Sequence, residues 1–185
     1  MDTLSICFTI NREHEENLSL EEYKSFFHGN IYEVIEAGKK KLIPNYDEIY
    51  EERTRELIVP EELKNLIKKI DKEKKLAIVS STPGSTIRDI LEREGIATYF
   101  SDFFGSDVDR SKVVKIKMLL EKYKVSPDDA VFITDTVGDI MEARECGVES
   151  IAVTWGFHEE KTLQKAKPEK IVSTPEDLLK AIQEI

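Results

Sequence analysis

The fold is decided by the stretch Val131-Phe-Ile-Thr-Asp-Thr-Val-Gly-Asp-Ile-Met-Glu-Ala-Arg-Glu-Cys-Gly147. Its first four residues are typical of a buried strand, and two acidic residues, Asp135 and Asp139, follow before a helix begins. Two carboxylates at the carboxyl end of a strand suit a hard divalent cation such as Mg²⁺, and open α/β sheets bind their ligands at that edge. A plainer interpretation is that Asp139 caps the helix while Asp135 lies in an ordinary loop. This stretch alone fits both interpretations.

The composition is that of a soluble globular protein with one domain and, at most, a modest insert. The chain has 185 residues, of which 40% are hydrophobic and 35% are charged. A net charge of −10 argues against general binding to nucleic acids or anionic membranes. No apolar run approaches the roughly 20 residues that span a bilayer, and no signal peptide is recognisable. Because Cys7 and Cys146 also form no motif, we expect a cytoplasmic protein.

Two patterns divide the chain. Residues 11–57 are charged and helix-favouring, with breaks at Gly29-Asn30 and Pro44-Asn45, which indicates a small helical bundle. From Pro60 onward, helices alternate with short apolar strands, which we expect at residues 76–79, near 103–104, and at 131–134, 150–154 and 170–173. This alternation predicts the α/β class, with a doubly wound parallel sheet covered on both faces. We therefore predict an N-terminal helical cap over residues 1–58 and an α/β core over residues 59–185.

Two further positions carry residue types that are useful for phosphate chemistry. Ser80 ends an apolar strand beside the loop Thr82-Pro83-Gly84, where its hydroxyl and backbone amides can hold phosphate oxygens. Lys112 opens a helix, where a cation opposes the helix dipole, so we expect an anion nearby. Each position also has an ordinary explanation, because residues 80–82 can simply cap the next helix and Lys112 can be a surface lysine.

The ordered set of these motifs resembles the haloacid dehalogenase-like hydrolases, in particular the phosphoglycolate-phosphatase-like branch with a helical cap. Leu76-Ala-Ile-Val-Ser80 resembles the family's second motif, Ser111-Lys112 its third and Asp135-Thr-Val-Gly-Asp139 its fourth. Val153-Thr-Trp-Gly-Phe157 also resembles this branch, and the resemblance covers nearly the whole chain. One departure is Thr134, because the family usually has glycine before its first metal-binding acid.

The resemblance implies a Mg²⁺-dependent phosphomonoester hydrolase that works through an aspartyl-phosphate. In that mechanism Ser80 and Lys112 are catalytic and stabilise the phosphoryl oxygens, Ser81 is a substrate-binding neighbour, and Asp135 and Asp139 bind Mg²⁺. The substrate would be a small phosphorylated metabolite.

The resemblance also marks Phe27-His28-Gly29-Asn30 as the cap's substrate loop. His28 and Asn30 are therefore candidates for substrate recognition. An ordinary surface or packing role for His28 is the alternative.

The family's first motif, an apolar strand followed by Asp-x-Asp-Gly, is not found near the start of this sequence. The only Asp-x-Asp is Asp107-Val-Asp109, whereas Met1-Asp-Thr-Leu4 resembles the residues that directly follow the motif. The expectation is a chain that begins just past its catalytic strand, whose core lacks its first strand and which is inactive without the nucleophile. The alternative is a non-catalytic phosphate- and metal-binding or regulatory module.

A missing central strand would leave two apolar strand edges exposed or forced together. By resemblance, the segment Leu4–Ile10 forms the first cap-linking helix, but its β-favouring composition suggests that it fills the vacant strand position. Pairing of two chains at the exposed edges is a second way to fill that position. Both a monomer and a homodimer therefore remain open.

Two other classes fit the sequence less well. A receiver-like signalling domain places its acids first in the chain, whereas Ser80 and Lys112 precede the acids here. Nucleotide-binding folds are disfavoured because the sequence contains neither a Gly-x-Gly-x-x-Gly turn nor a Gly-Lys-Ser/Thr loop.

Overall fold

The computed structural model describes residues 3–14, 18–40, 43–55 and 57–184. The chain folds into two compact units, of which the first contains the residues up to Phe26 together with Ile31–Arg110. The second contains the four-residue segment Phe27–Asn30 and the residues from Ser111 onward. The described strands form one sheet of two strands and one sheet of three, and all of the pairings are parallel. The predicted α/β class with parallel strands is therefore confirmed.

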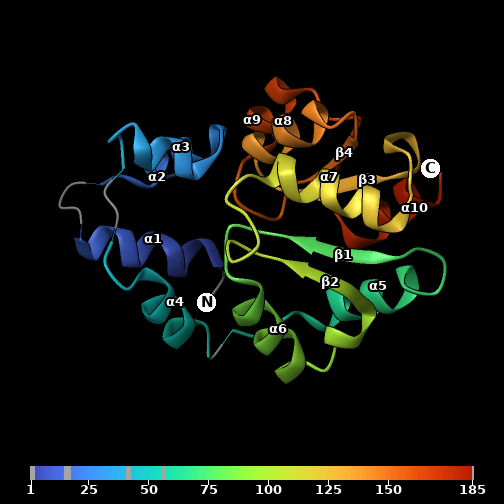
Figure 1. Cartoon of the computed structure of the whole chain (residues 1–185), viewed down its shortest axis with the longest axis horizontal. Helices are drawn as coiled ribbons and strands as arrows, with labels where there is room; N and C mark the ends of the chain where they lie inside the picture. Colours follow the sequence, from blue (N-terminus) through green and yellow to red (C-terminus); the bar gives the residue numbers. More distant parts are fainter. Residues whose placement is uncertain (1–2, 15–17, 41–42, 56, 185) are drawn as a thin grey trace. The chain divides into compact units, whose positions relative to one another are not determined.

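The first unit begins with helices. These are α1 (Thr3–His14), α2 (Leu20–Ser25), α3 (Ile31–Glu36) and α4 (Tyr46–Thr54). The 3₁₀ turn η1 (Phe26–His28) follows α2, and its last two residues belong to the second unit. Helices α1 and α4 lie side by side (Figure 1) and share a hydrophobic core with the segment that precedes α4. That core contains Ile6, Ile10, Ile43 and Tyr50. The described part of residues 11–57 consists of helices joined by turns and short connections, as the sequence predicts. Its division from the rest of the chain at residue 58 stays a prediction.

The segment Leu4–Ile10 lies within α1, as the resemblance implied. The hypothesis that its β-favouring residues occupy a strand position is therefore wrong. Ile6 and Ile10 stand four residues apart, so they project from one face of the helix into the shared core, where both are buried. This packing decides the structure, because β propensity is a weaker preference than the burial of a continuous apolar face. The pairing of two chains stays a prediction.

The rest of the first unit is a βαβ arrangement. Its elements are α5 (Glu61–Ile70), β1 (Leu76–Val79), α6 (Gly84–Arg93), η2 (Ala97–Tyr99) and β2 (Phe100–Phe104). Strands β1 and β2 run side by side in Figure 1, with Val79 opposite Phe104 at their carboxyl ends. Helix α6 packs on β2 and is closed by Gly95, whose φ of 71° is a left-handed conformation that suits glycine.

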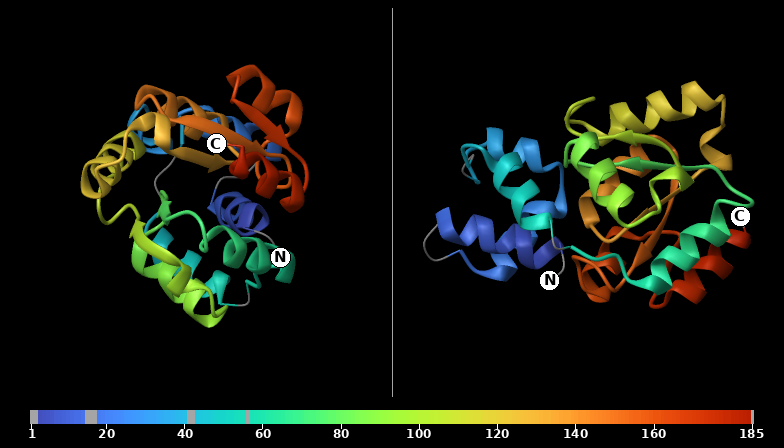
Figure 2. Two further views of the ribbon diagram at one scale, coloured as in Figure 1. Left: turned by 90° about the vertical axis from the view of Figure 1, so that its right-hand side faces the viewer. Right: turned by 90° about the horizontal axis from the view of Figure 1, so that it is seen from below.

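The second unit is a three-stranded sheet between helices. Its elements are α7 (Lys112–Tyr123), η3 (Pro127–Asp129), β3 (Val131–Thr134), α8 (Val137–Glu145), β4 (Glu149–Val153), α9 (Glu160–Ala166), β5 (Lys170–Val172) and α10 (Pro175–Gln183). The strand order is β3-β4-β5. Helices α8 and α9 pack together on one face of this sheet and α10 lies against the other (Figures 1 and 2). Ile140, Ala152 and Leu163 form the core beneath α8 and α9. The parallel order brings the carboxyl ends of β3 and β4 to one edge.

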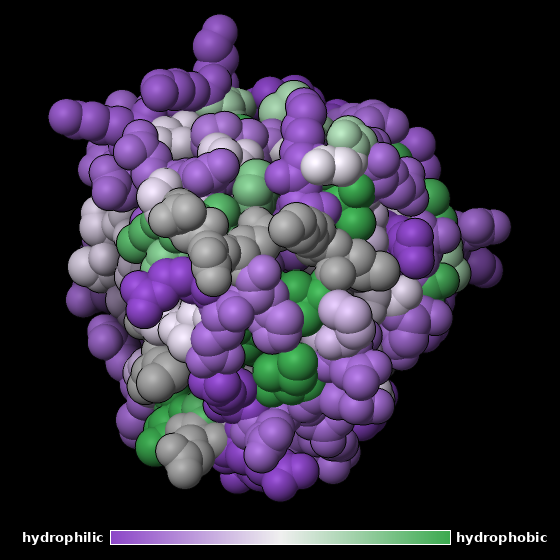
Figure 3. Space-filling model, turned by 90° about the vertical axis from the view of Figure 1, so that its left-hand side faces the viewer, coloured by the Kyte–Doolittle hydropathy of each residue, from purple (hydrophilic) through white to green (hydrophobic). Residues whose placement is uncertain are grey.

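The face drawn in Figure 3 is dominated by hydrophilic residues, and hydrophobic side chains appear on it in small groups. Ile58 is 75% exposed and Met141 is 53% exposed, and these are the largest values among the big hydrophobic residues of the described ranges. In those same ranges, none of the helices combines the length and the apolar character that crossing a membrane requires.

Candidate active site

Asp135 follows β3 directly and is held by the loop after β4. Its Oδ2 atom accepts a hydrogen bond from the backbone N–H of Phe157 at 2.8 Å, and its backbone carbonyl accepts one from the N–H of His158 at 3.0 Å. Burial raises the pKa of the Asp135 carboxyl, and the nearby charge of Asp139 raises it further. The carboxyl end of β3 therefore presents a carboxylate whose charge is poorly solvated.

Asp139 lies in the first turn of α8, where both of its oxygens bind groups of the chain. Lys112 Nζ forms an ion pair with Oδ1, and the hydroxyl of Thr134 donates to Oδ2 at 2.9 Å. Thr136 is the residue that caps α8, because its hydroxyl accepts from the N–H of Asp139 at 3.3 Å. The plain interpretation of Asp139 as the helix cap is therefore wrong.

Lys112 is the first residue of α7 and faces two anions. Ser111 caps the helix through its hydroxyl, which accepts from the N–H of Val114 at 3.3 Å. The side chain of Lys112 binds Asp139, and its backbone N–H donates to Oε1 of Glu142 at 3.1 Å. The prediction that an anion lies near this lysine is confirmed.

Ser80 lies in the first unit, directly after β1. Its N–H donates to the carbonyl of Phe104 at 2.9 Å, and its hydroxyl accepts from the N–H of Thr82 at 3.0 Å. The N–H of Gly84, at the start of α6, donates to Oδ1 of Asp107 at 2.7 Å. Two of the loop amides that we expected to face phosphate are thus bound to acceptors of the chain itself.

Ser81 belongs to the same loop, and its carbonyl accepts from the hydroxyl of Tyr32 at 3.1 Å. The phosphate-binding role of Ser80 and the substrate-binding role of Ser81 stay predictions. The contact of Asp107 with Gly84 gives the Asp107-Val-Asp109 pair a structural task at the N-terminus of α6.

The segment Phe27–Asn30 belongs to the second unit and contacts both α8 and the loop after β4. The ring centroids of Phe27 and Phe157 are 4.5 Å apart, and those of His28 and His158 are 5.1 Å apart. Asn30 Nδ2 donates to Oε1 of Glu142 at 2.9 Å. Roles for His28 and Asn30 in substrate recognition stay predictions, and the structure adds an intramolecular partner for the Asn30 amide.

Two glycines shape the site, and the sequence motifs contained both without showing why. A Cβ atom on Gly156 would lie 2.1 Å from Oδ2 of Asp135. A Cβ atom on Gly138 would lie 2.5 Å from the carbonyl oxygen of Gly29. Glycine is needed at both positions because another part of the chain approaches the backbone closely.

Three more residues of the site were not predicted from the sequence. They are Thr134 and Glu142, which contact Asp139 and Lys112, and His158, whose Nδ1 accepts from the N–H of Val137 at 3.0 Å. The position of Glu142 was a usable signal, since it stands three residues after Asp139 and so shares its face of the helix.

The donors at the end of β3 fit a hard divalent cation. Asp135 and Asp139 supply carboxylate oxygens, which Mg²⁺ prefers, and the poorly solvated carboxylate of Asp135 would gain from a nearby positive charge. Across the described ranges, His, Cys, Asp and Glu side chains do not form a group of three or more that could hold a metal ion. The remaining ligands would be water or phosphate oxygens, which is usual for Mg²⁺.

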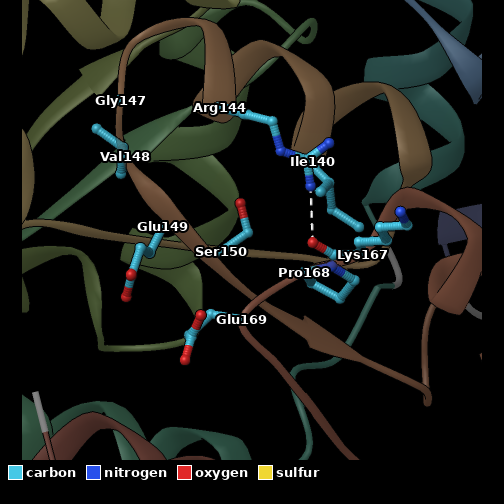
Figure 4. A pocket seen from close by; sticks show the side chains of 9 residues that line it. All are labelled: Ile140, Arg144, Gly147, Val148, Glu149, Ser150, Lys167, Pro168 and Glu169. Carbon is cyan, nitrogen blue, oxygen red and sulfur yellow. Dashed lines mark hydrogen bonds between the residues drawn. The ribbon is translucent and has the colours of Figure 1, made fainter.

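A pocket of about 200 Å³ lies elsewhere in the second unit, around the start of β4 (Figure 4). Arg144 lines it and donates to the carbonyls of Ala166 and Lys167, as the dashed line to Lys167 shows. These carbonyls end α9, so the guanidinium satisfies groups that lack partners within that helix. The arginine is thus engaged in structure, and none of the predicted site residues lines this pocket.

The family model for haloacid dehalogenase-like hydrolases matches residues 3–153. The chain therefore belongs to this family. It is 30% identical to a phosphoglycolate phosphatase of Vibrio cholerae over 110 residues, which are 58% of this chain and 49% of that protein. A phosphoglycolate phosphatase of Synechococcus elongatus is 31% identical over 110 residues, which are 60% of this chain and 52% of that protein. The chain thus spans about half the length of the curated relatives it matches.

Solved structures share the fold. A haloacid dehalogenase-like family hydrolase from Streptococcus pneumoniae superposes with a TM-score of 0.74 at 21% identity, over 96% of this chain and 88% of the other. A hydrolase from Pseudomonas syringae gives a TM-score of 0.77 at 16% identity, over 99% and 91%. At these identities the comparison establishes the fold alone.

Proposed function

We propose that the protein is a Mg²⁺-dependent phosphomonoester hydrolase of the phosphoglycolate-phosphatase type, which acts on a small phosphorylated metabolite in the cytoplasm. The observation that supports this most is the cluster of Asp135, Asp139 and Lys112 at the carboxyl end of β3 in a member of this hydrolase family. Phosphoglycolate is the substrate named for the curated relatives and is the first compound to test.

The chain's own residues would act mainly by charge and position. Lys112, oriented by Asp139, would stabilise the negative charge on the phosphoryl oxygens, and the hydroxyl of Ser80 would donate to another such oxygen. Asp135 would hold Mg²⁺, with Asp139 reaching it through water. The bound cation would neutralise charge on the phosphoryl group and orient it. In a chain that carries an Asp-x-Asp-Gly strand, its first aspartate would attack phosphorus and break the bond to the ester oxygen, which would take a proton from the second aspartate and leave as the alcohol. Water would then hydrolyse the aspartyl-phosphate, releasing inorganic phosphate and restoring the carboxylate.

The test is hydrolysis of an aryl phosphate and of phosphoglycolate with Mg²⁺, by this chain and by a chain extended with an apolar Asp-x-Asp-Gly strand. We expect turnover from the extended chain. In that chain, Lys112→Ala and Asp135→Asn should each lower kcat by about 100-fold or more, the scale of losing one charge-stabilising group. Ser81→Ala should be much milder, because the contact seen for Ser81 uses its backbone carbonyl. Full activity in either of the first two variants would contradict the assignment.

A non-catalytic phosphate- and metal-binding module is the second candidate. The sequence's only Asp-x-Asp pair supports this candidate, because Asp107 of that pair accepts a hydrogen bond from the N–H of Gly84 at the N-terminus of α6. Binding of Mg²⁺ and inorganic phosphate without turnover in either the given or the extended chain would favour it. Turnover by the extended chain would exclude it.

A further inference from the structure

Glu142 connects two segments of the second unit that are far apart in sequence. Its Oε1 atom accepts from the side-chain amide of Asn30 at 2.9 Å and from the backbone N–H of Lys112 at 3.1 Å. The first bond joins residues 112 positions apart, and both donors meet the same oxygen. A shift of either donor would therefore disturb the acceptor of the other.

The Lys112 amide depends on this acceptor. It is the first N–H of α7, and the first N–H groups of a helix have no partner within the helix. A carboxylate at this end is also favoured by the helix dipole. Here the carboxylate comes from α8, so the contact fixes the start of α7 against α8 at the residue whose side chain binds Asp139.

The Asn30 side of the contact is equally constrained. Gly138, in the first turn of α8, allows the carbonyls of Phe27 and Gly29 to approach so closely that an added Cβ would lie 3.0 and 2.5 Å from them. The ring of Phe27 packs against that of Phe157, in the loop whose backbone holds Asp135. The segment is thus held at one end by packing and at the other by the bond from Asn30 to Glu142.

We propose that Glu142 is a positioning residue that latches the segment Phe27–Asn30 to the N-terminus of α7. The latch couples the position of this segment to that of Lys112. In this assignment one N–H of the Asn30 side-chain amide serves the latch. The consequence for catalysis rests on the proposed function, whereas the latch itself can be tested without it.

The first test is amide hydrogen exchange of Lys112, followed by NMR on the chain as it exists. Glu142→Ala should speed this exchange about 10- to 150-fold, the range expected for losing a hydrogen bond to a charged acceptor. Glu142→Gln keeps an acceptor oxygen and should stay within about threefold of the original rate. Glu145→Ala is the matched control, because Glu145 lies on the same helix and is exposed. Unchanged exchange in Glu142→Ala would overturn the proposal.

The second test uses charge on the Asn30 side and does not depend on the folding of Glu142→Ala. Asn30→Asp places a carboxylate against Glu142, so it should release the segment, speed exchange of Lys112 and speed chymotrypsin cleavage after Phe27. Adding Glu142→Gln to that variant supplies an amide that can donate to the new carboxylate while its oxygen accepts from Lys112. This combination should restore both readouts. If the double variant exchanges the Lys112 amide and is cleaved as fast as Asn30→Asp alone, the two residues are not coupled.

The third test concerns catalysis in the extended chain. Glu142→Ala should lower kcat for an aryl phosphate about 5- to 30-fold by loosening Lys112, and Glu142→Gln should recover most of it. Equal losses in both variants would refute a positioning role. If the extended chain hydrolyses no phosphate ester at all, the proposed function fails, and the exchange and cleavage results still decide on the latch.

Discussion

Gly156 is the position at which one methyl group should do the most damage to the candidate site. A Cβ atom there would lie 2.1 Å from Oδ2 of Asp135, 2.4 Å from its Cβ and 2.6 Å from its Cγ. Rotation of the aspartate can move the carboxylate but not its Cβ, so the backbone of one segment must shift. The hydrogen bond from Phe157 to Oδ2 ties these same two segments together, and it would be strained by the shift.

The cost can be bounded from these distances. Carbon atoms in contact prefer separations of about 3.5–4.0 Å, so the overlap with the Asp135 Cβ exceeds 1 Å. Overpacking of this kind usually costs about 1–3 kcal/mol. For a chain of this length, 1 kcal/mol corresponds to roughly 2–4 °C in Tm, so a loss near 2 kcal/mol lowers Tm by about 4–8 °C.

The assay is thermal unfolding of Gly156→Ala with and without Mg²⁺. A ligand at 100 times its Kd stabilises the protein to which it binds by about 2.7 kcal/mol, so a bound cation should raise the Tm of the original chain. The variant should lose this Mg²⁺-dependent rise because its Asp135 carboxylate is displaced. Gly29→Ala is the control, since an added Cβ at Gly29 meets nothing within 4 Å. A variant that melts with the original chain and keeps the Mg²⁺ response would refute the reasoning.

Two further predictions follow from the same contacts. Burial raises the pKa of Asp135, so the folded chain binds the carboxyl proton more tightly than the unfolded chain does. Ionisation of Asp135 therefore destabilises the fold increasingly as the pH rises above the ordinary aspartate pKa. Asp135→Asn should raise Tm at pH 7 without Mg²⁺, and this gain should shrink as the pH is lowered towards about 4. Thr134→Val removes a buried hydroxyl that donates to Asp139 and accepts from the N–H of Thr136. The free energy of unfolding, measured in urea, should therefore fall by about 1–3 kcal/mol. Thr134→Ser retains the hydroxyl and should keep most of the original free energy of unfolding.

The sequence predicted most elements because their signals are local. The strand at residues 131–134 is found as predicted, and the helix predicted to open at Lys112 begins there, with Ser111 as its cap. Helix α9 was not predicted, because it has only seven residues and a Glu159 cap position without a side-chain hydrogen bond. The composition of residues 4–10 suggested a strand, whereas the segment is helical because Ile6 and Ile10 are buried against α4, more than 30 residues later in the sequence.

For the candidate site, the motifs predicted which residues take part, but not all of the contacts between them. The motif order placed acids and a lysine at strand and helix ends, and the structure joins Lys112 to Asp139. The bonds of Glu142 were not predictable, since one joins it to Asn30 across 112 positions and the other ends on a backbone N–H that any residue type supplies. Contacts of this kind depend on how α7, α8 and the segment Phe27–Asn30 pack, which no local pattern specifies.

Thr134 departs from the family pattern and contacts one of the two acids, which bears on the roles we propose for them. The family usually has glycine at this position, whereas the threonine hydroxyl here binds one oxygen of Asp139 while Lys112 binds the other. The charge of Asp139 is thus already compensated by groups of the chain. Asp135 is bound by backbone N–H, and burial raises its pKa, so its carboxylate is the one that gains most from a cation. We propose that Asp135 would be the direct ligand of a divalent cation, and that Asp139 would mainly orient Lys112.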